Sequence, residues 1–120
     1  MITMRTDLPD HVLGADASGT ITATDYETVL VPAIEAFRQS HGKIRALVVL
    51  GAEFEGFEGG AMWDDAKLGL REAGEWERLA VVTDRGHIRS LVNAFKFMIP
   101  GEVKTFEMAQ LDDAKAWVAQ

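Results

Sequence analysis

The chain has 120 residues, no cysteine and a formal net charge of −7, so it suits one domain over residues 1–120 whose core needs no disulfide. The missing cysteine excludes thiolate metal sites and cysteine catalysis, and the negative charge disfavours nucleic-acid partners. No apolar run is long enough to span a membrane and the first residues lack a signal core, so we expect a cytoplasmic protein.

The first part of the chain predicts two short strands and a helix. The strands cover residues 2–6 and 11–17, and Ser18-Gly19 after them is typical of a tight turn. A hydroxyl at Thr24 followed by Glu27 matches a capping box, which opens an amphipathic helix. Pro32 lies inside that helix and removes a backbone donor, so we expect a kink or a restart there.

The rest of the chain alternates strands with helices. The unbroken apolar run over 44–50 predicts a strand covered on both faces, and the glycine-rich stretch over 51–60 predicts a loop. The later elements are a helix over 62–73, a strand over 78–83, a helix over 88–99, a strand over 103–106 and a helix around 111–118. This order predicts an α/β fold, with a mostly parallel mixed sheet of four to five strands and about four helices.

An ordered set of segments along nearly the whole chain resembles the STAS superfamily of sulphate transporters and anti-sigma-factor antagonists, and within it the SpoIIAA-like branch. The resemblance implies a sheet packed with helices and no established enzymatic activity. The segments that carry it are 19–26, 47–50, 54–56, 63–67, 78–84, 104–106 and 114–117.

One departure from this family changes the functional expectation. Anti-sigma-factor antagonists carry a hydroxyl after the central strand that a partner kinase phosphorylates, whereas residues 51–60 hold no Ser or Thr. The phosphorylation switch is therefore not carried over. The SpoIIAA-like branch is also similar in shape to CRAL-TRIO lipid-binding domains, which implies a hydrophobic ligand or membrane contact.

Aromatic side chains are the candidate ligand-binding residues. Phe54 and Phe57 stand in the glycine-rich stretch, close to Trp63. Two phenylalanines there can form a mobile apolar lid, or they can pack into the core beneath the loop. We keep both alternatives and assign Phe54, Phe57 and Trp63 to a small apolar ligand.

A second candidate is a surface for a membrane or a second copy of the chain. Phe97 lies opposite the buried stripe of its predicted helix, and Arg85, Arg89 and Lys96 surround it. Basic residues near anionic lipid contribute about 1 kcal/mol each, so membrane contact would be weak and peripheral. A homodimer through the same helix would explain Phe97 equally well.

Catalysis and metal binding are the least favoured interpretations. Asp84 and His87 could form an acid–base pair in a small hydrolase or lyase, but Asp84 also suits the N-cap of the next helix. Glu53, Glu55 and Glu58 lack the spacing of a calcium loop. We expect no cofactor, metal or phosphorylation site. The favoured function is a non-enzymatic binding or regulatory module, and the alternative is a dimeric protein-interaction module without phosphoregulation.

Overall fold

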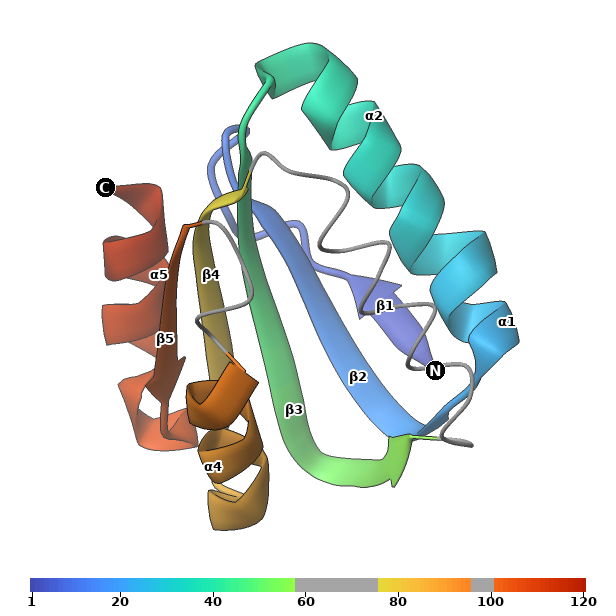
Figure 1. Cartoon of the computed structure of the whole chain (residues 1–120), viewed down its shortest axis with the longest axis vertical. Helices are drawn as coiled ribbons and strands as arrows, with labels where there is room; N and C mark the ends of the chain where they lie inside the picture. Colours follow the sequence, from blue (N-terminus) through green and yellow to red (C-terminus); the bar gives the residue numbers. More distant parts are fainter. Residues whose placement is uncertain (58–75, 96–100) are drawn as a thin grey trace.

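The computed structural model describes residues 1–57, 76–95 and 101–120. The strands in these ranges form one five-stranded sheet in the order β1-β2-β3-β4-β5. β1 (Ile2–Met4) runs antiparallel to β2 (Leu13–Ile21). β2, β3 (Ile44–Phe57), β4 (Trp76–Thr83) and β5 (Glu102–Phe106) are parallel neighbours (Figure 1). The predicted mixed, mostly parallel sheet of an α/β fold is confirmed.

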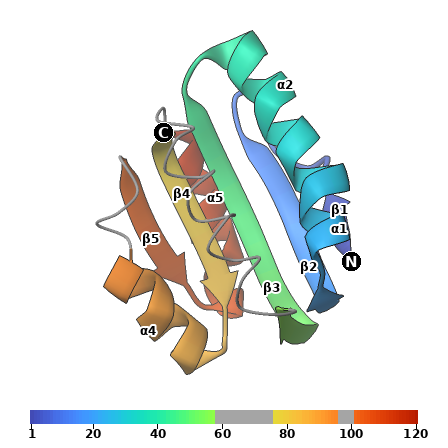
Figure 2. The same cartoon turned by 45° about the vertical axis from the view of Figure 1, so that its right-hand side comes forward.

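Helices cover both faces of the sheet. On one face, α1 (Ala23–Asp25) continues through a π-helical turn, Tyr26–Leu30, into α2 (Val31–His41). Figure 2 shows α4 (Gly86–Phe95) on that same face, whereas α5 (Leu111–Ala119) lies behind the sheet. The helix predicted over 62–73, and the predicted continuation of α4 over 96–99, lie outside the described residues.

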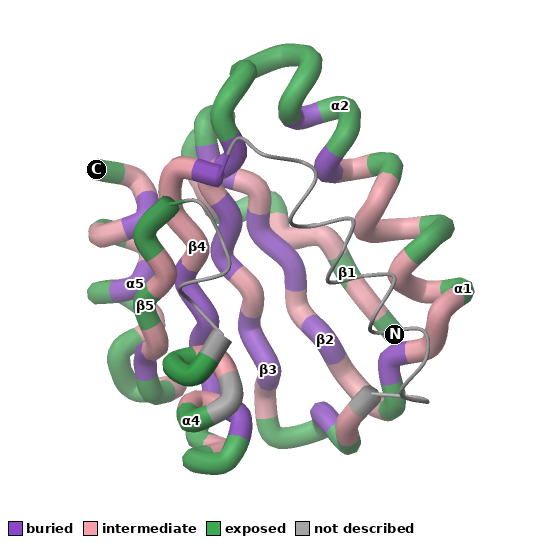
Figure 3. Tube along the Cα trace, in the orientation of Figure 1, coloured by how far each residue is buried: buried purple, intermediate pink, exposed green. Residues whose placement is uncertain are grey.

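Apolar side chains are buried on both faces of the central strands, as predicted for residues 44–50. Figure 3 shows the buried residues along these strands. Behind the sheet, Leu47 and Val49 of β3 pack with α5. On the other face, Ile44 and Ala46 pack with Phe37 of α2. A parallel strand covered on both sides has no exposed face, which explains its continuous apolar sequence.

The turn predicted at Ser18-Gly19 is wrong, because β2 runs through both residues. The pairing of β2 with β3 shifts between Ala17 and Gly19 and again before Thr20. β3 advances from Leu50 to Gly56 while β2 advances only from Ala17 to Thr20, so the extra residues of this bulge lie on β3, opposite Gly19. Gly19 adopts a φ of 62°, a backbone conformation that glycine reaches without steric cost. Glycine therefore marks an irregularity within the strand here.

The loop predicted over 51–60 is wrong in its first part, because β3 continues to Phe57. β4 stops pairing with β3 at the Leu50–Thr83 pair, whereas β2 still pairs beyond it, with Gly19 opposite Phe54. Residues 51–57 and 19–21 therefore form a two-stranded extension beyond the last β4 pair. Residues 51–57 belong to the stretch after the central strand, where anti-sigma-factor antagonists carry the hydroxyl that is phosphorylated.

The predicted capping box is also displaced by two residues. Thr22 caps the helix: its hydroxyl accepts from the N–H of Asp25, and the Asp25 carboxylate accepts from the N–H of Thr22, both at 3.1 Å. A kink or a restart is expected near Pro32; the structure has a π-helical turn, Tyr26–Leu30, directly before it, and the helical backbone continues from that turn into α2 at Val31. Proline fits the first turn of a helix because no partner is needed for its missing N–H.

Candidate functional site

A cavity of about 470 Å³ lies on the sheet face that carries α1, α2 and α4. The π-helical turn contributes Tyr26 and Leu30 on one side, and α4 contributes Ile88 and Val92 on the other. The sheet forms the floor. Its apolar floor residues are Ala15, Ala17 and Ile21 of β2, Val48, Leu50 and Phe54 of β3, and Leu79 and Val81 of β4.

Phe54 is the predicted ligand-binding residue that the structure places in this cavity. Its side chain is 0% exposed and packs with Leu50 and Ile88. Of the two alternatives, burial in the core is therefore the one that the structure shows for Phe54. Phe57 ends β3 opposite Ile21, and Trp63 lies outside the described residues.

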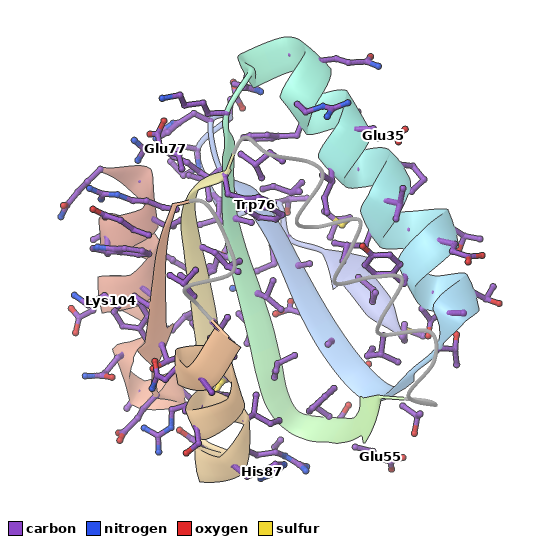
Figure 4. The ribbon with its side chains drawn as sticks, viewed as in Figure 1. Glu35, Glu55, Trp76, Glu77, His87 and Lys104 are labelled. Atoms are coloured by element: carbon purple, nitrogen blue, oxygen red, sulfur yellow. The ribbon has the colours of Figure 1, made fainter. Side chains whose placement is uncertain are left out.

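Charged side chains gather where the cavity meets the carboxyl ends of the strands. Arg85 follows β4, and its guanidinium carbon lies 5.7 Å from the centre of the Phe54 ring. Figure 4 shows His87 at the start of α4, at the same edge of the sheet as Glu55. Arg85, His87 and Glu55 all line the cavity, so its open end is polar whereas its floor is apolar.

Two other polar residues line the cavity. Asp16 is paired with Arg5, whose Nη1 lies 2.7 Å from the carboxylate. Tyr26 is half-buried, and burial raises the pKa of its hydroxyl. Glu55 is exposed and accepts a hydrogen bond from the Thr20 hydroxyl at 3.5 Å.

Asp84, the acid of the candidate acid–base pair with His87, makes its contact with another part of the chain. The Asp84 carboxylate accepts from the N–H of Met108 at 2.9 Å, and no hydrogen bond between Asp84 and His87 occurs in the described structure. Asp84 is not the N-cap of α4, because the first backbone turn of that helix closes on the Arg85 carbonyl. Asp84 therefore connects β4 to the segment before α5.

The predicted membrane or dimer surface is divided by the fold. Arg85 lines the cavity, whereas Arg89 pairs with Glu107 through one contact of 3.3 Å. Lys96 and Phe97 lie outside the described residues. Contact of this surface with a membrane or with a second copy of the chain stays a prediction.

The described ranges hold no cluster of three or more histidine or acidic side chains arranged for a metal ion. In the same ranges, no helix has the length and apolarity needed to cross a lipid bilayer.

Sequence reasoning did not identify most of the cavity lining. Leu50, Val81 and Ile88 were expected simply as core, and Arg85 as surface. Their positions in the chain do indicate a site, since each stands near the carboxyl end of a parallel strand or just after it. Ligands of open α/β sheets bind at that edge.

Comparisons with known proteins agree with this architecture. A family model described as SpoIIAA-like matches residues 12–119. No curated protein matches the chain. The crystal structure of an uncharacterized protein of the DUF3478 family from Shewanella loihica PV-4, described as having a SpoIIAA-like fold, is similar with a TM-score of 0.72 and 30% sequence identity. The match covers 98% of this chain and 93% of that one.

These comparisons bear on the fold and the family, and the likeness to CRAL-TRIO domains stays a prediction. The match to the family model spans most of the chain, including the strands and helices that surround the cavity. The protein therefore belongs to the SpoIIAA-like family, within the STAS-type folds to which its sequence is similar.

Proposed function

We propose that this protein is a non-enzymatic binding module that takes a small, mainly apolar ligand into the cavity between the π-helical turn and α4. The cavity itself is the observation that supports this function. Its volume of about 470 Å³ falls within the range of small-molecule sites, roughly 300–1,000 Å³. An apolar cavity of about 150 Å³ is already enough for benzene.

The composition of the lining favours binding over catalysis. Its described residues include no serine, threonine, cysteine or lysine, so the usual nucleophiles are missing from this part of the wall. His87 has no hydrogen bond to Asp84, the acid expected to orient it, within the described structure. These features support a site that holds a molecule without transforming it.

A neutral fluorescent probe tests this proposal. We expect N-phenyl-1-naphthylamine to bind the purified protein saturably at one site, with increased emission. Val48→Phe places a larger side chain on the cavity floor and should abolish the signal. Val103→Phe makes the same change at a half-buried position of β5 outside the lining, and should leave binding intact.

Circular dichroism confirms that each variant is folded before the comparison is made. Native mass spectrometry after gentle purification gives an independent measurement, in which we expect a bound molecule of small mass. The proposal is overturned if the probe does not saturate and the mass spectrum shows the bare chain. It is also overturned if folded Val48→Phe binds the probe as well as the unmodified protein does.

A further inference from the structure

The polar end of the cavity indicates which chemical class of ligand the site takes. Four other arginines of the described structure form ion pairs with carboxylates: Arg5, Arg45, Arg78 and Arg89. Arg85 is half-buried and forms no ion pair with any residue that the structure describes. A partly buried guanidinium is stabilised by a paired anion, so its position in the cavity wall favours a negatively charged group.

The geometry around Arg85 favours one end of the cavity for that group. The guanidinium lies against the ring of the buried Phe54, so it stands at the boundary between the apolar floor and the open edge. His87 follows two residues later, lines the same cavity and can donate a hydrogen bond from its ring. The N-terminus of α4 begins between them at Gly86, and its dipole acts in the same direction.

The acidic residues of the lining limit the charge of the ligand. Asp16 is already paired with Arg5 and so opposes an anion less strongly. Glu55 is exposed at the same edge as His87, and the whole chain carries a formal charge of −7. A dianion would meet more repulsion from these charges than a monoanion would, whereas the fork of an arginine fits a carboxylate through two parallel hydrogen bonds.

We infer that the ligand is an amphipathic carboxylate, with its head group at Arg85 and His87 and its apolar body on the floor formed by Leu50, Val81 and Ile88. This inference rests on the proposed binding function and specifies the ligand of the same cavity.

Three probes with the same ten-carbon chain separate the head groups: decanoate, decanol and decyl phosphate, each displacing N-phenyl-1-naphthylamine below its micellar concentration. We expect decanoate to bind roughly tenfold or more tightly than decanol, as expected for a charge-assisted hydrogen bond. Decyl phosphate should bind less tightly than decanoate because of its second charge.

Arg85→Met keeps an apolar stem and removes the charge. We expect this variant to lose the preference for decanoate over decanol. Arg38→Met is the matched control, because Arg38 is exposed on α2, away from the lining, and its removal changes the net charge equally. It should keep the preference.

The outcomes separate this inference from the proposed function. If decanol and the fluorescent probe bind but decanoate binds no better than decanol, the carboxylate assignment is overturned and the binding module stands. The assignment is also overturned if decyl phosphate binds tightest or if folded Arg85→Met keeps the preference. If no probe binds, both proposals fail. Should Arg85→Met not fold, the three-probe comparison on the unmodified protein still decides the head group.

Discussion

At the scale of single residues, Phe54 and Arg85 contribute different properties to the cavity wall. The Phe54 ring is completely buried and contributes apolar area, whereas the Arg85 guanidinium lies 5.7 Å from the centre of that ring. An aromatic face attracts a cation, with an interaction of about 0.5–2 kcal/mol that grows as water is excluded. Phe54 therefore helps to hold a charge at the border of an otherwise apolar site.

Asp7 gives a residue-scale prediction about acid stability. Its carboxylate bonds to Arg5 through two contacts of 2.8 and 3.0 Å and lies 2.6 Å from Lys115 of α5. The hydrogen bond from Arg5, followed by that from Lys115, lowers the pKa of Asp7 far below its ordinary value. The folded protein therefore binds this proton less readily than the unfolded chain does.

The stability that Asp7 contributes is present above the ordinary aspartate pKa of about 3.9 and is lost as the pH falls through the lowered value. We expect the unfolding free energy of the unmodified protein to fall more steeply than that of Asp7→Asn between about pH 5 and pH 3. Urea titrations at several pH values measure both slopes. Asp10→Asn removes an exposed carboxylate nearby and should keep the original slope; equal slopes for all three proteins would contradict the prediction.

At the scale of elements, the N-terminus of the first helix depends on Thr22. Its hydroxyl and the Asp25 carboxylate satisfy two backbone N–H groups of the first turn. Thr22→Ala should lower the unfolding free energy by about 1 kcal/mol, the usual cost of losing such a cap. Urea unfolding at neutral pH measures this change.

Thr24→Ala is the matched control for this prediction, because it removes the same hydroxyl two residues later. Thr24 is exposed, and it is its backbone carbonyl that accepts a hydrogen bond from Thr28. Alanine preserves that carbonyl and favours a helix, so we expect almost no loss of stability. A larger loss for Thr24→Ala than for Thr22→Ala would show that the cap lies at the later residue.

The order of the elements was predictable, whereas some of their ends were not. Continuous apolar runs identified β3 and β4 because both strands are covered on two faces. Glycine content favoured a loop after Leu50, but Glu53 and Glu55 are exposed on either side of buried Phe54, the alternation of a strand. The glycines favoured a loop over that alternation, whereas in the structure the pairing with β2 continues β3 to Phe57.

At the scale of the whole molecule, the site arises from topology. Parallel strands place their carboxyl ends at one edge, so Phe54 of β3 and Arg85 after β4 meet although their residue numbers differ by 31. Sequence periodicity predicts which residues are buried, but it does not show that the π-helical turn and α4 line two sides of one cavity over the sheet. For that reason the cavity required the structure, which places the predicted ligand-binding residue Phe54 in its lining.

The two-stranded extension has a consequence for how the proposed ligand would enter. Residues 46–50 of β3 have a partner strand on each side, whereas 54–57 pair with β2 alone among the described strands. Amides held from one side open through local fluctuations that leave the rest of the sheet intact. Hydrogen exchange followed by mass spectrometry should show faster deuterium uptake over 53–57 than over 46–50, with bound decanoate slowing the former. Equal uptake along all of β3 would contradict this. Access to the cavity would then depend on local opening of the two-stranded extension, at a free energy well below that of global unfolding.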